Sequence, residues 1–178
     1  TQPAKRTPKP RYTLPCCTLC TRKVSRMTDH SNVLNDAINL AKEFRPRLPA
    51  DTACWDLLSS LLVHAGESIV EEFAEESLRA IAANSATYVS LVEGVSEGAV
   101  YHLCREEYNR AHEKHNGLTP YNHALSDGGR LVVLAEEIGE VARALTYDEG
   151  DEDNLVEELI QVATVALAWL ARVLEDNK

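Results

Sequence analysis

Aromatic residues are scarce in this 178-residue sequence, making up 6% of it, and methionine occurs once. With many Ala, Glu and Leu in their place, the composition favours an all-helical protein. Long apolar runs are also missing. No stretch approaches the roughly 20 apolar residues of a membrane span, and the basic N-terminus lacks the apolar run of a signal peptide. We therefore expect an all-α protein with no membrane partner and a cytoplasmic location.

Cysteine is present in an odd number, five, and three of these residues crowd near one end. This distribution is not that of a disulfide framework. Cys16, Cys17 and Cys20 include one Cys-x-x-Cys at the spacing of half a zinc site. A complete site needs a second pair, whereas Cys54 and Cys104 each stand alone. Unpaired thiols are therefore favoured over zinc.

The net charge of −10 is unevenly distributed. The first 26 residues hold seven Lys or Arg and no acid, which leaves 11 basic and 28 acidic residues, a net charge of −17, for residues 27–178. Such an acidic body repels nucleic acid and anionic membranes. We expect no nucleic-acid partner, although a nucleotide can bind if a metal screens the carboxylates.

Three regions follow from the pattern of the chain. Residues 1–27 form a basic, proline-rich arm that reads as disordered. Organised sequence begins directly after Met27, so a translation start at Met27 is one interpretation of this boundary. Residues 28–98 form a helical N-terminal region, and residues 99–178 form a second helical domain. A chain of this length buries one good core.

Apolar periodicity predicts the helices. We expect helices over residues 31–44, from about Asp51 to Gly66, over 67–83, over 86–92 and over 98–115, followed by two helices in the last third of the chain. Ala65-Gly66 marks a weak point between the second and third helices. Asn116-Gly117 closes the helix over 98–115, and Asp127 is the expected N-cap of the next helix.

The last two helices form the most informative stretch. Their apolar stripes are Leu131, Leu134, Ile138, Val141 and Leu145 on the first, and Leu155, Leu159, Val162, Ala166, Leu170 and Val173 on the second. An acidic loop with one glycine separates them, and Asn154 with Glu157 resembles a capping box. The loop lacks the ligand spacing of a calcium-binding EF-hand. The pair is therefore predicted to be an antiparallel hairpin.

Carboxylates recur on this hairpin at matched positions. Glu137 and Glu140 are three residues apart and share one helix face, and Glu158 and Gln161 repeat that spacing on the second helix. At about 1.5 Å of rise per residue, both pairs lie at similar heights. Clustered carboxylates favour a hard divalent ion, Mg²⁺ above all. The alternative is a solvated acidic helix face.

The pattern Glu136-Glu137-x-x-Glu140, seventeen residues, then Glu158-x-x-Gln161 resembles the EExxE…ExxD signature of the MazG-like all-α nucleoside triphosphate pyrophosphohydrolases. The resemblance covers about residues 99–174. It implies an antiparallel helical bundle with extra N-terminal helices, and Mg²⁺-dependent (or Mn²⁺-dependent) cleavage of a nucleoside triphosphate to a monophosphate and pyrophosphate. A nucleotide-pool house-cleaning role and a homodimer or homotetramer are also implied.

Residue by residue, the resemblance assigns roles to the motif. Glu137, Glu140 and Glu158 would hold the metal with Gln161 in the fourth place, and Glu136 would orient or deprotonate the attacking water. Arg143, one turn beyond Glu140, would contact phosphate. The family's closing Asp is Gln161 here, so the site loses one negative charge. A catalytically weakened or dead binding, regulatory or structural helical protein is therefore the alternative.

Two further groups of residues have competing interpretations. Arg105, Arg110 and Lys114 lie on the helix that walls the nucleotide pocket in MazG-like proteins, but salt bridges to nearby Glu are favoured over phosphate contacts. His112 and His115 are spaced like metal ligands, and a surface pair is the favoured interpretation.

A second EExxE occurs at residues 71–75, where it lacks a partner motif at the family's spacing. We interpret it as a solvated acidic face. Whether residues 28–98 are a decayed repeat of the hairpin or a helical extension stays open from sequence.

Overall fold

The computed structural model describes residues 30–44, 54–69, 74–146 and 152–178. These residues form helices and no strand, so the expected all-α class is confirmed. The helices are α1 (His30–Glu43), α2 (Cys54–Glu67), α3 (Ala74–Glu93), α4 (Glu97–Lys114), α5 (Asp127–Thr146) and α6 (Glu152–Asp176). The expected basic arm, with Cys16, Cys17 and Cys20, lies outside the described residues.

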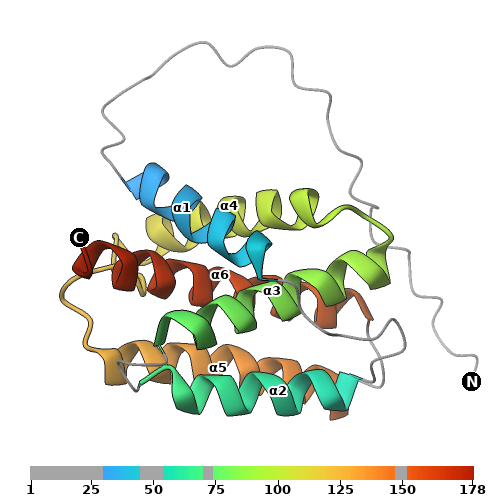
Figure 1. Cartoon of the computed structure of the whole chain (residues 1–178). Coiled ribbons are helices and arrows are strands. Elements are labelled where there is room, and N and C mark those ends of the chain that lie inside the picture. The colour runs from blue at the N-terminus through green and yellow to red at the C-terminus, as the bar shows by residue number, and fades with distance from the viewer. Residues whose placement is uncertain (1–29, 45–53, 70–73, 147–151) are drawn as a thin grey trace, which may run out of the picture.

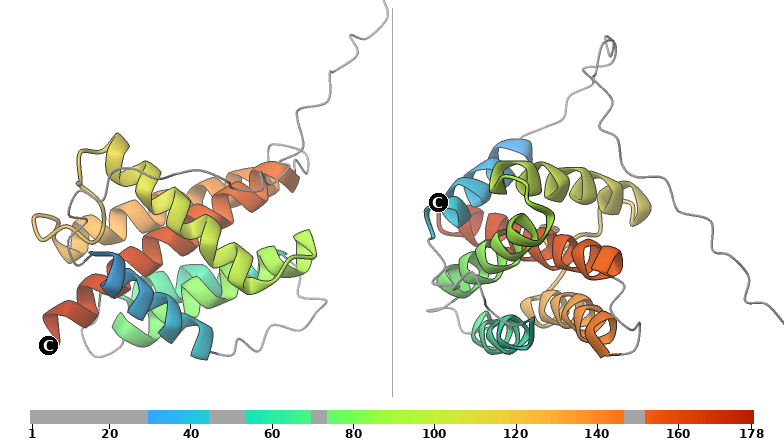
Figure 2. Two further views of the ribbon diagram at one scale, coloured as in Figure 1. Left: turned by 90° about the horizontal axis from the view of Figure 1, so that it is seen from above. Right: turned by 90° about the vertical axis from the view of Figure 1, so that its right-hand side faces the viewer.

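The helices stack in three layers of two (Figures 1 and 2). α2 and α5 form one outer layer, α3 and α6 the middle layer, and α1 and α4 the other outer layer. The two helices of each layer run in opposite directions (Figure 1). α6 packs against α1, α3, α4 and α5. The helices of residues 30–93 therefore cover the apolar stripe of the α5–α6 hairpin within one chain.

α6 owes its central place to a largely apolar stretch that is buried on every side. Residues 162–172 of this helix are all buried, among them Trp169 and Leu170. A helix that is apolar all round must be buried in a core or in a membrane. Within the described part of the chain, Asn154–Asp176 is the one helix with the length and mean hydropathy (1.3) to cross a membrane, although 61% of that window is buried inside the bundle.

Two buried arginines anchor the loop that leads into α5. Arg130 donates hydrogen bonds to the carbonyl oxygens of Pro120 (2.7 Å) and Asn122 (3.0 Å). Arg172, on α6, lies 2.7 Å from a ring nitrogen of His123 in this loop, donates to Glu175 at 2.8 Å and also pairs with Asp176. Since an unpaired buried charge is costly, these contacts offset the burial of both guanidinium groups. The first turn of α5 is thereby held against α6.

Two expected boundaries in the N-terminal region are wrong. The helix expected to begin at Glu67 begins at Ala74 instead, whereas α2 ends at Glu67, one residue after the expected weak point at Ala65-Gly66. The separate helices expected over 67–83 and 86–92 are one helix, α3. Asn84 and Ser85 lie inside it and are buried, and the Asn84 amide donates to the Ser60 hydroxyl on α2 at 3.3 Å. A tertiary contact here offsets a weak local helix preference.

Two expected caps also differ. The Ser126 hydroxyl accepts a hydrogen bond from the Gly129 N–H at 3.2 Å, so Ser126 rather than Asp127 caps α5. α6 begins at Glu152, which places Asn154 within the helix instead of at its cap. By contrast, α4 ends as expected, with Asn116 and Gly117 at positive φ of 52° and 81°.

Leu159, fully buried on α6, provides a test of this core. Leu159→Ala is expected to lower the free energy of unfolding by about 2–5 kcal/mol, because it removes buried methyl groups and leaves a cavity. Leu62→Ala on α2 is the matched control, since Leu62 is 56% exposed and exposed positions change stability by about 0.5 kcal/mol or less. Urea denaturation of both variants measures the difference, and equal losses would contradict the packing described.

Candidate metal centre

Three carboxylates meet where α5 and α6 lie side by side. Glu137 and Glu140 project from α5 and Glu158 from α6, and each offers an oxygen within 4.8 Å of those of the other two. The spacing of three residues puts the two α5 side chains on one face, and the hairpin brings α6 opposite. Among the described residues, this is the one group of His, Cys, Asp or Glu side chains with a geometry suited to a metal ion.

Proton affinity is raised at two of these carboxyl groups. Burial raises the pKa of Glu137 to about 7, and the negative charges of Glu140 and Glu136 add to the rise. Burial also raises the pKa of Glu158 to about 7, followed by the charge of Glu140 and a hydrogen bond between the Glu158 and Glu140 carboxyl groups. Such a hydrogen bond needs a proton on one of the two. Without a cation, the cluster therefore holds protons near neutral pH.

One oxygen of this cluster has no hydrogen-bond partner. Glu137 Oε2 is buried, and no described residue donates a hydrogen bond to it. A buried carboxylate oxygen without a donor is unfavourable. It is available to a cation that enters between the helices.

Gln161 contacts the cluster through its amide nitrogen. The Gln161 side-chain N–H donates to Glu158 Oε2 at 2.8 Å. This hydrogen bond partly replaces the cation that an Asp at the same position would require. The fourth motif position therefore lies in the site, but in an orientation that stabilises the metal-free cluster.

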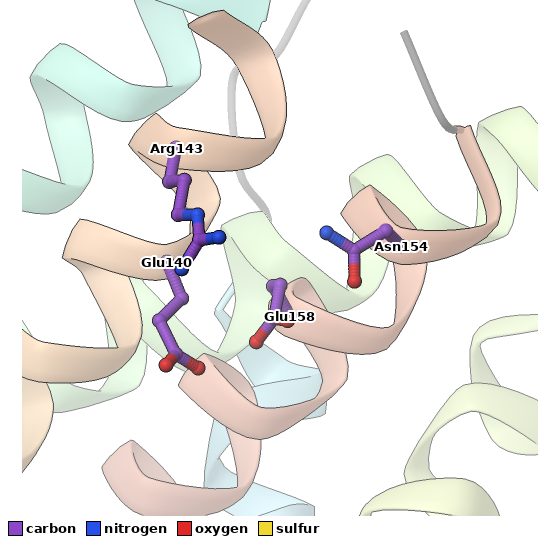
Figure 3. A pocket seen from close by; sticks show the side chains of 4 residues that line it. All are labelled: Glu140, Arg143, Asn154 and Glu158. Atoms are coloured by element: carbon purple, nitrogen blue, oxygen red, sulfur yellow. The ribbon is translucent and has the colours of Figure 1, made fainter. Parts of the chain in front are cut away.

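A small pocket opens beside the carboxylates (Figure 3). It has a volume of about 230 Å³ and is lined by Glu140, Arg143, Asn154 and Glu158. Side chains from α5, Glu140 and Arg143, face Asn154 and Glu158 of α6 across it, and the Glu140 carboxylate points away from the Arg143 guanidinium (Figure 3). Pockets that enclose drug-sized ligands measure about 300–1,000 Å³. This one is therefore smaller than the pockets that enclose whole drug-sized ligands.

Glu136 lies outside the pocket and is exposed. It is close enough to Glu137 for its charge to raise that residue's pKa. Gly139, between the two α5 carboxylates, leaves open space, because a Cβ there would meet nothing within 4 Å. The face of α5 at Gly139 is therefore not covered by another part of the described chain.

α4 adds charges that sequence reasoning treated as secondary. Glu107 raises the pKa of Glu137 and Lys114 lowers it, so both act on the site from a third helix. Arg110 forms a two-point ion pair with Glu107, with distances of 2.7 and 2.5 Å. Arg105 instead donates a hydrogen bond to Asn35 on α1. Of the three candidate phosphate contacts, Arg110 therefore has its expected salt bridge and Arg105 is directed elsewhere.

The other candidate ligands do not assemble. His112 packs near the ring of Tyr108, with centroids 6.0 Å apart, and His115 is the C-cap of α4. Cys104 is a buried free thiol. Glu71 and Glu72 of the second EExxE lie outside the described residues, while Glu75 forms a 3.7 Å ion pair with Arg79.

Asn154 and Glu107 are the site residues that sequence reasoning missed. Asn154 was assigned to a cap, so its place in the pocket depended on the true start of α6 at Glu152. Glu107 lies on α4, and the packing of α4 against α6 brings its charge near Glu137. No local sequence pattern signals this contact, because it depends on how α4 packs.

Comparison with models of known protein families, with curated proteins and with solved structures finds no match to this chain.

The raised carboxyl pKa values predict a pH-dependent stability in the absence of divalent ions. Because the folded pKa values of about 7 exceed the ordinary 4.5, the stabilisation is complete below pH 4.5 and is lost as the pH rises through 7. We expect a loss of about 2 kcal/mol between pH 5 and pH 8, a figure reduced because solvent screens these half-exposed groups. Thermal unfolding in EDTA measures it.

Glu137→Gln is the control for this titration. It removes one of the two raised carboxyl groups, so the loss of stability between pH 5 and pH 8 should be smaller than in the natural protein. Mg²⁺ added at pH 8 should raise the Tm of the natural protein more than that of the variant. An identical pH dependence in both proteins would contradict the assignment.

Proposed function

We propose that this protein is a Mg²⁺-dependent nucleoside triphosphate pyrophosphohydrolase, which cleaves the bond between the α and β phosphates and releases a monophosphate and pyrophosphate. The observation that supports the proposal most strongly is the meeting of Glu137, Glu140 and Glu158 at one point between two helices. These are the residues that the MazG-like motif assigns to the metal.

The donor set fits Mg²⁺, and Mn²⁺ as a substitute. Three carboxylates supply hard oxygen ligands, which Mg²⁺ prefers, and the unpartnered Glu137 Oε2 is one of them. When bound, Mg²⁺ supplies positive charge to the phosphate oxygens and favours ionisation of a water molecule. Gln161 can offer its carbonyl oxygen only if the amide turns away from its present hydrogen bond to Glu158.

The remaining residues have defined tasks in this reaction. Arg143 binds the phosphate chain in the pocket it shares with Glu140, and Asn154 orients that chain from the opposite wall. Glu136 accepts a proton from the attacking water, as a carboxylate next to the metal ligands. Attack by that water on the triphosphate breaks the α–β phosphoanhydride bond, with pyrophosphate as one product.

The proposal includes a cytoplasmic house-cleaning role on the nucleotide pool. A homodimer or homotetramer also remains part of it, as the resemblance implies. Since α1–α3 pack against the hairpin within one chain, such an oligomer would form through exposed surface instead of the stripe on α6.

One observation favours the alternative of an inactive binding or regulatory protein. Gln161 donates its amide hydrogen to Glu158, so the cluster is stabilised without a cation. An Asp at this position would add a fifth negative charge to Glu136, Glu137, Glu140 and Glu158 and make a cation necessary. In the alternative, the bundle persists and its pocket binds a nucleotide without cleaving it.

Pyrophosphate release from a panel of ribo- and deoxynucleoside triphosphates, with Mg²⁺, Mn²⁺ or EDTA, tests the proposal. We expect metal-dependent release. Glu140→Gln should lower kcat/KM by about 100-fold or more, because it removes a metal ligand. Glu43→Gln is the matched control, since Glu43 is exposed on α1, and it should leave the rate unchanged.

Gln161→Asp separates the two functions. The added charge should tighten Mg²⁺ binding about tenfold. Pyrophosphate release by the natural protein would support the enzyme. If the natural protein releases no pyrophosphate but the Gln161→Asp variant does, the protein is an inactivated pyrophosphohydrolase. No release from either protein would overturn the proposal and favour the binding function.

A further inference from the structure

The two halves of the described chain repeat one three-helix arrangement. We call α1–α3 the N-terminal unit and α4–α6 the C-terminal unit. α3 packs against α1 and α2 as α6 packs against α4 and α5. Between the units, α3 packs on α6, α2 on α5, and α1 and α4 each contact the third helix of the other unit. Exchanging the units leaves this packing pattern unchanged, as a pseudo-twofold axis requires (Figure 2).

Buried positions repeat in the same register in all three helix pairs. The buried residues compared are Val33, Leu34, Ala37 and Ala41 with Val100, Tyr101, Cys104 and Tyr108; Leu57, Leu61, Ala65 and Ser68 with Arg130, Leu134, Ile138 and Val141; and Ala74, Ser77, Ala80 and Ile81 with Val156, Leu159, Val162 and Ala163. Within each comparison the spacing is identical. Helical periodicity imposes part of this agreement, so residue identity is the stronger criterion.

Residue identity repeats in the second helix of each unit. The register is the one in which the buried residues of α2 and α5 coincide. In that register four residues are identical, namely Leu58 and Leu131, Leu61 and Leu134, Gly66 and Gly139, and Glu67 and Glu140. Glycine is unfavourable inside a helix. Packing requires neither glycine, because a Cβ at either position would meet nothing within 4 Å. A shared segment of sequence accounts for this match, and a shared packing requirement does not.

We propose that the chain is an internal duplication, and that the N-terminal unit carries a second copy of the carboxylate site that the protein itself has neutralised. Glu67 corresponds to Glu140 and Glu76 to Glu158. His64 stands at the position of Glu137, and Arg79 at the position of Gln161. The inference rests on the proposed function in taking the C-terminal copy as the metal site.

Contacts in the N-terminal unit agree with this correspondence. Glu67 Oε2 accepts a hydrogen bond from the Ser77 hydroxyl at 3.3 Å, which places Glu67 beside the start of α3. Unlike Glu137, Glu140 and Glu158, the side chains of His64, Glu67 and Glu76 do not gather within 4.8 Å of one another. His64 Nδ1 is 3.0 Å from Glu67 Oε2. Arg79 brings a positive charge that pairs with Glu75 at 3.7 Å.

The copies also differ in the length of their hairpins. Glu140 and Glu158 are eighteen positions apart, whereas Glu67 and Glu76 are nine apart. Arg143 and Asn154, which line the pocket, lie in the additional segment of the C-terminal hairpin. The N-terminal copy therefore has no counterparts of these two pocket residues and acts as the supporting half of the bundle. One chain thus holds one working site. It also supplies the second three-helix unit that the first needs in order to bury its apolar faces.

Restoring the missing ligands tests the proposal. The double variant His64→Glu/Arg79→Gln gives the N-terminal copy the side chains of Glu137 and Gln161. Mn²⁺ binding is counted by electron paramagnetic resonance of the free ion. We expect one bound Mn²⁺ in the natural protein and two in the double variant. The second should bind more weakly, because the Glu67 side chain is 48% exposed.

Two control proteins make the count specific. His64→Gln/Arg79→Gln removes the same side chains without adding a carboxylate and should bind one Mn²⁺. Glu140→Gln added to the double variant should leave only the N-terminal ion. If the double variant unfolds in EDTA, its folding on addition of Mn²⁺ counts as binding, and failure to fold in Mn²⁺ overturns the proposal.

The outcomes separate this inference from the proposed function. One Mn²⁺ in both the natural protein and the folded double variant overturns the second site and leaves the proposed function standing. No Mn²⁺ in the natural protein and one in the double variant supports the second site and contradicts the proposed function. No Mn²⁺ in either protein overturns both.

Discussion

The burial of α6 is the constraint on which the rest of this structure depends. Its middle stretch, residues 162–172, has no exposed residue, so helices must surround it. α1, α3, α4 and α5 all pack against it. Because α5 is fixed against the polar first turns of α6, Glu137 and Glu140 are held opposite Glu158. The apolar part of one helix thus determines the geometry of charged groups near its other end.

Those charged groups oppose folding in the absence of a cation. Burial and mutual repulsion raise the pKa of both Glu137 and Glu158 to about 7. Perturbed carboxyl groups that cluster beside a pocket are characteristic of functional sites. The hydrogen bond from Gln161 to Glu158 relieves part of the repulsion, at the cost of weaker cation binding. The same side chain therefore sets the balance between stability and the proposed activity.

Local patterns predicted much of the fold and the core of the site. The apolar stripes of α5 and α6, with the three-residue spacing of Glu137 and Glu140, were sufficient to bring these carboxylates to Glu158. The predicted helix boundaries are wrong where tertiary contacts determine how far a helix extends. The sequence pattern predicts a break between residues 83 and 86, but α3 continues through Asn84, whose side chain bonds to Ser60 on α2. The packing of α3 on α6 joins residues far apart in sequence, so no local pattern signals it.

The position of α6 after the helices that surround it has a consequence for synthesis. A polypeptide emerges from the ribosome N-terminus first, so α1–α3 and α4 are complete before the helix that they cover exists. Until α6 appears, the faces of α3 and α5 that it will cover are exposed to water. The core therefore cannot close until α6 has been synthesised. Glu152–Asp176 then covers the apolar faces of helices that were made before it.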